Sequence, residues 1–138
     1  MDFYKQMYLR GKKAEIDLVK ILWRKGFFAI RSPGSGRRAR RVFYPDIIAI
    51  RKGRIILFEV KLRKHRDTIH IPEWNIRKYR ELMERTNGEF YIAIKITGEQ
   101  RWFIFTLDQL EKQEHNGKTR YVITVSLFEK AKTIEDIL

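Results

Sequence analysis

The chain has 138 residues, of which 43% are hydrophobic and 34% are charged. This length and hydrophobic content predict a single folded domain over residues 1–138. Lys and Arg number 30 against 17 Asp and Glu, and the formal net charge of +13 predicts a polyanionic partner such as nucleic acid. The absence of cysteine excludes disulfides, thiolate zinc sites and cysteine nucleophiles, and no apolar run reaches the length of a membrane span. We therefore expect a cytoplasmic protein. The positive charge alone does not identify its function, because a basic ribosomal protein or a membrane-surface binder would share it.

The first half of the chain predicts one helix followed by three strands. Apolar side chains recur at helical spacing over residues 8–25, and Gly26 beyond them is typical of a helix end. Short apolar runs predict strands over 27–31, 46–50 and 55–62. Lys52-Gly53 predicts a hairpin between the last two, and the run at 55–62 lacks alternation, as a central strand does. Ahead of the helix, an aromatic, lightly basic arm that includes Phe3 and Tyr8 either covers the core or contacts DNA.

The second half predicts a polar connection over residues 65–71 and then a second helix. Pro72 suits the first turn of this helix, which we expect to reach about Thr86. Its predicted inward residues are Trp74, Tyr79, Leu82 and Met83. Two strands follow, at 90–96 and 102–105, and then a short helix that is capped by Thr106 and reaches Lys112. A turn at Asn116-Gly117 leads to a last strand at 121–125, and a capping box begins at Thr133. The order of helices and strands predicts an α/β fold.

Two carboxylates and an ammonium lie at the ends of two neighbouring predicted strands. Asp46 opens the first, after Tyr44-Pro45, and Glu59-Val60-Lys61 ends the second. Glu59 and Lys61 are two residues apart on a strand, so their side chains leave the same face. Two carboxylates repel one another unless a cation lies between them, and Mg²⁺ is held in proteins by one or two carboxylates. The alternative is a charged cluster at the sheet edge, because Glu-x-Lys and Pro-Asp are each common.

Glu15 adds a third acid. A helical wheel puts it at the centre of the apolar arc of the first helix, between Leu18, Val19 and Leu22. Burying an unpaired carboxylate costs several kcal/mol, so Glu15 needs a partner. A metal shared with the other acids or Lys61 would supply one, and the alternative is an inward salt bridge to another lysine or an arginine.

A glycine-rich basic loop precedes Asp46. Gly34 and Gly36 flank Ser35 and allow a phosphate to approach the backbone closely, and guanidiniums bind phosphate oxygens with two hydrogen bonds. The arginines in or beside this loop are Arg31, Arg37, Arg38, Arg40 and Arg41. Ser32 and Ser35 are candidates for contact with the cleaved phosphate, and the alternative for the whole loop is a solvated run of charge. Together the loop and the acids predict metal-dependent cleavage of a nucleic-acid backbone.

These residues also resemble a known family. Arg10-Gly11-Lys12-Lys13-Ala14-Glu15, Gly26-Phe27, Arg31-Ser32-Pro33-Gly34-Ser35, Asp46 and Glu59-Val60-Lys61 are similar to motifs of the archaeal Holliday junction resolvases. That family belongs to the restriction-endonuclease-like PD-(D/E)xK superfamily, and the resemblance continues to Phe105. It implies a mixed central β-sheet flanked by α-helices. It also implies a homodimer that nicks two strands of a four-way DNA junction with Mg²⁺ or Mn²⁺, in DNA recombination and repair.

The resemblance assigns roles to individual residues. Glu15, Asp46 and Glu59 would be acids of the metal site, Lys61 the catalytic lysine and Ser35 an assisting residue, and we expect the Val60 carbonyl to be a further metal ligand. The expected DNA-binding residues are Arg10, Lys12, Arg31, Ser32, Arg37, Arg38, Arg40 and Arg41. The chain departs from the family in its longer arginine-rich loop and longer N-terminal arm, so the assisting serine is either Ser32 or Ser35.

Two other functions are compatible with the sequence. One is another endonuclease of the same fold, of restriction or repair type, and the other is a non-catalytic nucleic-acid-binding protein. Apolar residues near the C-terminus are candidates either for the dimer contact or for the end of the monomer core: Leu127, Phe128, Ile134, Ile137 and Leu138.

Overall fold

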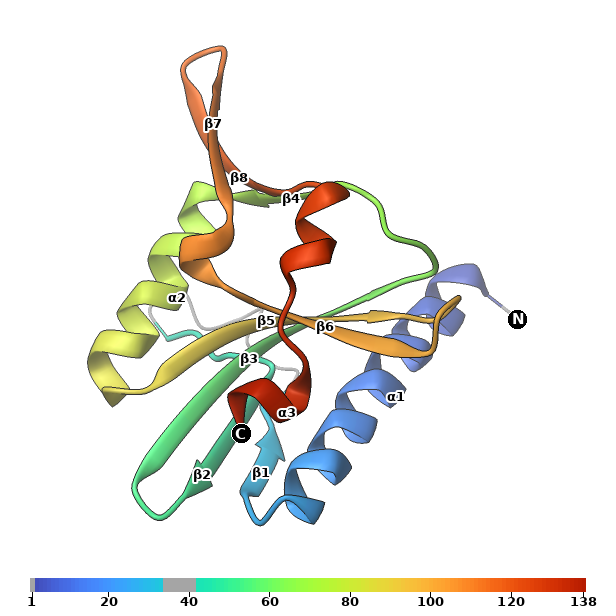
Figure 1. Cartoon of the computed structure of the whole chain (residues 1–138), viewed down its shortest axis with the longest axis vertical. Coiled ribbons are helices and arrows are strands. Elements are labelled where there is room, and N and C mark those ends of the chain that lie inside the picture. The colour runs from blue at the N-terminus through green and yellow to red at the C-terminus, as the bar shows by residue number, and fades with distance from the viewer. Residues whose placement is uncertain (1, 34–41) are drawn as a thin grey trace.

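The computed structural model describes residues 2–33 and 42–138 (Figure 1). Its main sheet has the strand order β1-β2-β3-β5-β6. These strands are β1 (Phe28–Arg31), β2 (Ile47–Arg51), β3 (Arg54–Arg63), β5 (Glu89–Ile96) and β6 (Arg101–Thr106). The β3–β5 pair is parallel and the other three pairs are antiparallel, so the sheet is mixed and β3 is its central strand, as predicted. The hairpin at Lys52-Gly53 is also confirmed, with positive φ angles of 47° and 86° at its two turn residues.

A smaller sheet with the order β4-β8-β7 lies beside the main one. Its strands are β4 (Ile69–Pro72), β7 (Glu111–His115) and β8 (Lys118–Ile123), and the β7–β8 hairpin projects from the molecule (Figure 1). The prediction of a polar connection over 65–71 was therefore wrong for residues 69–71, because these belong to β4, where Ile69 and Ile71 alternate into the core.

The short helix predicted from Thr106 to Lys112 is also a different structure. It is a single 3₁₀ turn, η1 (Leu107–Gln109), followed by β7. The turn closes because the Gln109 side chain accepts a hydrogen bond from the Thr106 backbone N–H at 2.9 Å. Beyond it Leu110 is extended, and the chain enters β7, which pairs with β8.

Helices cover the two faces of the main sheet. Helix α1 (Phe3–Arg24) buries Ala14, Leu18 and Leu22 against one face, and α2 (Glu73–Thr86) buries Ile76 and Tyr79 against the other. Helix α2 ends at the left-handed Asn87, as the Asn87-Gly88 pair predicted. The predicted inward position of Trp74 was wrong, because its side chain is exposed and lies beneath the Lys78 ammonium, 4.5 Å from the ring centroid.

Helix α1 begins five residues earlier than predicted. The Asp2 carboxylate accepts a hydrogen bond from the Tyr4 N–H at 3.1 Å and caps the helix, so the aromatic arm forms its first turns. Phe3, Tyr4, Met7 and Tyr8 are all exposed. Of the two roles left open for the arm, covering the core is therefore wrong.

The C-terminal residues finish the monomer core. A 3₁₀ helix η2 (Ser126–Lys130) and a short helix α3 (Ile134–Ile137) bury Phe128, Ile134 and Ile137, which excludes these three side chains from a dimer contact. The Thr133 capping box is confirmed by the 2.8 Å hydrogen bond from the Thr133 N–H to Asp136 Oδ2 and the 3.1 Å bond from the Asp136 N–H to Thr133 Oγ1.

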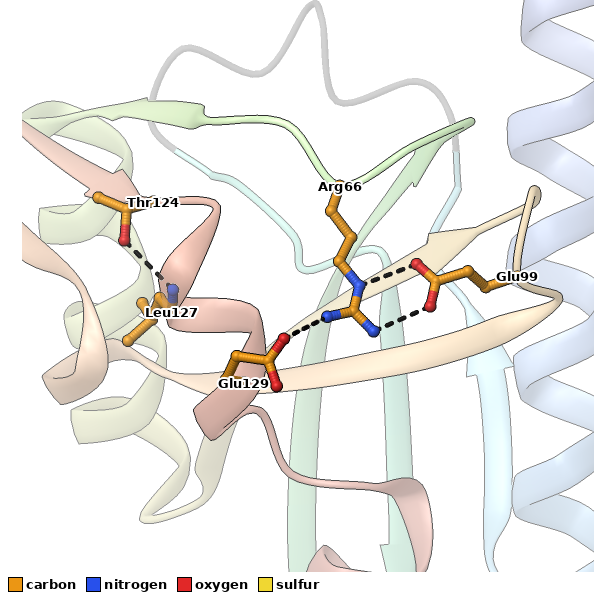
Figure 2. Close-up of polar contacts among 5 residues, drawn as sticks. All are labelled: Arg66, Glu99, Thr124, Leu127 and Glu129. Carbon is orange, nitrogen blue, oxygen red and sulfur yellow. Dashed lines mark hydrogen bonds and ion pairs between the residues drawn. The ribbon is translucent and has the colours of Figure 1, made fainter.

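The Arg66 side chain links three segments of the chain through hydrogen bonds (Figure 2). Its guanidinium donates two hydrogen bonds of 2.9 Å to Glu99 in the β5–β6 turn and one of 2.9 Å to Glu129 in η2. Because Arg66 lies between β3 and β4, these bonds join the main sheet to the C-terminal segment. No helix within residues 2–33 and 42–138 is long and apolar enough to cross a membrane.

Candidate active site

The alternation of β3 places Glu59 and Lys61 on the α2 face of the sheet. Leu57 and Ile55, in the same row of side chains, contact the core cluster of α2, whereas Ile56 and Phe58 contact that of α1. The predicted face that starts apolar and ends with an acid and a base is thus confirmed. Lys61 Nζ lies 3.8 Å from Glu59 Oε1.

Asp46 lies beside this pair because hydrogen bonds to β3 hold both its backbone and its side chain in place. The Asp46 N–H donates to the Phe58 carbonyl at 2.9 Å, which extends the β2–β3 ladder by one residue. The Asp46 Oδ2 atom accepts from the Val60 N–H at 2.8 Å. The end of the hairpin therefore holds two carboxylates on adjoining strands, as the sequence predicted.

The acids act on one another electrostatically. Burial and the charge of Asp46 raise the pKa of Glu59 to about 8, although the nearby Lys61 ammonium favours its ionised form. Burial and Asp46 also raise the pKa of Glu15, against the opposing effect of Arg31. The Asp46 charge thus disfavours ionisation of both Glu59 and Glu15, and a divalent cation beside these acids would offset that repulsion.

Glu15 is not at the centre of the apolar face of α1. That face is the line Ala14, Leu18 and Leu22, and Glu15 stands beside it. Its Oε1 atom lies 3.5 Å from Arg31 Nε, so the inward ion pair with an arginine, left open by the sequence, is present. Arg31 ends β1 and brings this pair to the edge of the acid cluster.

The donor set fits a hard divalent cation. Asp46 and Glu59 supply carboxylate oxygens, which Mg²⁺ prefers, and Mg²⁺ keeps several water molecules instead of demanding a closed protein cage. Within the described part of the chain, no three His, Asp or Glu side chains converge on one point that could hold a metal ion. The geometry therefore suits a cation bound by two carboxylates, with Glu15 at a greater distance.

Ser32 is the loop residue that the structure brings to the acids. Its N–H donates to the Asp46 carbonyl at 2.9 Å, and its hydroxyl is buried without a partner among the described residues. Ser35, Arg37, Arg38, Arg40 and Arg41 lie outside the described residues. Arg10 and Lys12 are exposed on α1, in the two turns before Glu15.

Two residues of α2 near the acids were not predicted as part of the site. Tyr79 is buried and stacks on Phe90 with ring centroids 4.4 Å apart. Burial and the charges of Glu59 and Asp46 raise its pKa, so its hydroxyl lies within their electrostatic reach. Asn75 Nδ2 donates to this hydroxyl at 3.4 Å, while Asn75 Oδ1 is buried without a partner in the described structure. The i, i+4 spacing of two polar groups behind Pro72 was the available sequence signal.

Paired acids and a lysine at the end of the central strand of a mixed sheet, in a strongly basic chain, define a nuclease-like site. The family model described as archaeal Holliday junction resolvase (Hjc) matches residues 6–138, and the chain belongs to this family. Nucleases of this family are generally metal-dependent.

Individual relatives agree with this assignment. The crossover junction endodeoxyribonuclease Hjc of Sulfurisphaera tokodaii is 36% identical over 129 residues, which cover 94% of this chain and 85% of that protein. The solved structure of Hjc from Archaeoglobus fulgidus, a Holliday junction resolvase, matches with a TM-score of 0.77 and 26% identity over 93% of this chain and 94% of that one. The structure of D212, a nuclease from a fusselovirus, has a TM-score of 0.51 at 9% identity over 96% and 86% of the two chains, a likeness of fold alone.

Proposed function

We propose that this chain is a crossover junction endodeoxyribonuclease that cuts the phosphodiester backbone of four-way DNA junctions with a divalent cation. The preferred ion is Mg²⁺, and Mn²⁺ can replace it. The observation that carries the proposal is the placement of Asp46 and Glu59 side by side at the end of the β2–β3 hairpin, with Lys61 next to Glu59, in a member of the resolvase family.

Each residue has a distinct part in the reaction. The Val60 N–H fixes one oxygen of Asp46, which leaves the other oxygen and the Glu59 carboxylate to bind the cation, with the Val60 carbonyl as a further oxygen ligand. When bound by these residues, a divalent cation would lower the pKa of a water molecule and offset negative charge on the phosphate. Lys61 positions the nucleophile or neutralises charge, and Glu15 assists directly or through water from its ion pair with Arg31. The loop serine, Ser32 or Ser35, contacts the phosphate.

Two substitutions test the metal assignment. Asp46→Asn and Glu59→Gln remove ligand charge but keep side-chain shape, so cutting should be lost while DNA binding persists or tightens. The matched control is Asp108→Asn, which makes the same charge change at an exposed position after β6. Cutting at the wild-type rate by either site variant would show that these acids do not hold the cation.

A comparison of substrates separates the proposal from its alternatives. Nicking of a synthetic four-way junction and of a linear duplex of the same sequence is followed in one gel, with and without Mg²⁺. A resolvase cuts the junction selectively, another endonuclease of this fold cuts both, and a non-catalytic binding protein cuts neither.

Paired nicks on opposing strands call for two active sites, and we propose a C₂ homodimer, the commonest closed oligomer. The described surface offers apolar side chains for such a contact in two segments. Val42 and Tyr44 are exposed on either side of Phe43, and Trp74 is exposed on α2. Lys78 Nζ lies 5.3 Å from the Phe43 ring centroid and 4.5 Å from that of Trp74, which joins these two segments into one surface. Sedimentation should give the mass of two chains. A monomer that cuts linear duplex as readily as junctions would contradict both the dimer and the resolvase function.

A further inference from the structure

The first turns of α1 extend beyond the core and expose apolar side chains to solvent. The exposed fractions are 68% for Phe3, 80% for Tyr4, 54% for Met7, 62% for Tyr8 and 45% for Leu9, whereas the first buried residue of the helix is Ala14. Figure 1 shows this end of the helix projecting past the main sheet, near the β5–β6 turn. Five neighbouring exposed apolar side chains form an unusual surface for a soluble chain and indicate a contact with a partner.

Part of this surface continues the face of α1 that carries Glu15. Tyr8 precedes Glu15 by seven residues and Tyr4 by eleven, and both spacings return to the same side of a helix. At about 1.5 Å per residue, the two tyrosines lie roughly 10 Å and 16 Å along the helix from Glu15. The two tyrosines therefore lie in line with Glu15 along the helix, beyond the edge of the acid cluster.

The charge of the segment matches nucleic acid. Residues 3–14 contain Lys5, Arg10, Lys12 and Lys13 and no acidic residue. A hollow of about 300 Å³ between α1 and the β5–β6 turn is lined by three cations, Arg10, Lys13 and Lys95, and by one acid, Asp17. A second copy of the chain would bring like charges together at this segment, which disfavours association, whereas phosphates would neutralise them.

We propose that residues 3–13 of α1, here called the α1 extension, bind DNA beside the cleaved phosphate and stack Tyr4 and Tyr8 on unpaired or unstacked bases. The inference rests on the proposed function, because it takes its position on the DNA from the acid cluster. At about 3.4 Å per nucleotide, Tyr8 and Tyr4 lie roughly three and five nucleotides from that phosphate. Aromatic side chains stack on any base whose face is free. A continuous duplex hides these faces, whereas the branch point of a junction can expose them, so the α1 extension favours junctions over linear DNA.

The test is the double substitution Tyr4→Ala and Tyr8→Ala in the full chain. Binding to a four-way junction and to a linear duplex is measured in EDTA, so that no cutting takes place. Removal of two stacked rings should weaken junction binding at least about tenfold and leave duplex binding within about twofold. The matched control is Phe3→Ala with Met7→Ala, which removes exposed apolar side chains from the helix line of Ala14 and should have a smaller effect on junction binding.

A conservative variant distinguishes stacking from a structural role. Tyr4→Phe with Tyr8→Phe keeps both rings and should bind junctions as the wild type does. An equal loss of junction and duplex binding in the alanine variant, or no loss in either, would overturn the proposal. A change from dimer to monomer on sedimentation of the alanine variant would also overturn it and assign the α1 extension to a second copy of the chain.

Failure of the inference and failure of the nuclease assignment give different results. If the wild type binds junctions through the two tyrosines but cuts nothing with Mg²⁺, the proposed function fails, and only the junction binding by the α1 extension is supported. If the wild type cuts junctions while the alanine variant binds them normally, the proposed function stands and the inference fails.

Discussion

Replacing Glu59 by Gln should stabilise the metal-free protein at neutral and alkaline pH. Burial and the charge of Asp46 raise the pKa of Glu59 from its ordinary 4.5 to about 8, so the folded state binds a proton that the unfolded chain has already released. The stability that this proton supplies is fully present below pH 4.5 and is lost as the pH rises to about 8. The difference of 8 − 4.5 = 3.5 pKa units, at about 1.36 kcal/mol each, sets a ceiling of about 5 kcal/mol. Gln cannot ionise and avoids this loss.

Urea unfolding of the wild type and Glu59→Gln between pH 4 and 9, in EDTA, measures the effect. The advantage of the variant should be smallest near pH 4.5, grow up to about pH 8 and stay constant above it. Asp108→Asn, which makes the same charge change at an exposed position, is the control for a general effect of charge. If Glu59 is a metal ligand, as proposed, addition of Mg²⁺ should stabilise the wild type preferentially. A difference between variant and wild type that is the same at every pH would refute the reasoning.

Two further predictions concern the basic loop and α2. Alanine substitution of Arg37, Arg38, Arg40 and Arg41 should weaken DNA binding. In a plot of the logarithm of the binding constant against the logarithm of the salt concentration, the slope should shrink by about 0.9 for each phosphate that is no longer neutralised. An unchanged slope would exclude the loop as a phosphate-binding segment. Tyr79→Ala removes the stacked ring over Phe90 and should lower the free energy of unfolding by about 3 kcal/mol, whereas Tyr79→Phe keeps the ring and should cost about 1 kcal/mol or less. Equal losses in these two variants, measured by urea unfolding, would show that the hydroxyl and not the stack dominates.

The sequence predicted those parts of the site that depend on local patterns. The hairpin turn at Lys52-Gly53 sets the register of β2 and β3, and this register brings Asp46 next to Glu59. The order of the elements and the central position of β3 follow from apolar runs and turn residues that lie close in sequence. These features need no knowledge of distant contacts.

Features that depend on distant partners were missed or misplaced. Strand β4 has four residues and pairs with β8 about fifty residues later, so no neighbouring turn announced it. Strand β7 reads Glu-Lys-Gln-Glu-His, without an apolar face, because it stands at the edge of a projecting sheet. Glu15 was assigned to the centre of an apolar arc because a helical wheel does not show that Arg31, sixteen residues later, would reach it.

The chain order of the site bears on how it assembles. Glu15, Asp46, Glu59 and Lys61 all lie on α1 and the β2–β3 hairpin, within the first 61 residues, whereas the residues that bury Glu59 arrive later with α2 and the parallel strand β5. Local contacts form before distant ones during folding, because closing a long loop costs more entropy. On a ribosome, we therefore expect the charged set to come together while it is still in water, which weakens the electrostatic interactions within it. Because burial is the main cause of the raised pKa of Glu59, we expect the docking of the second half of the chain to be the folding step that depends on pH.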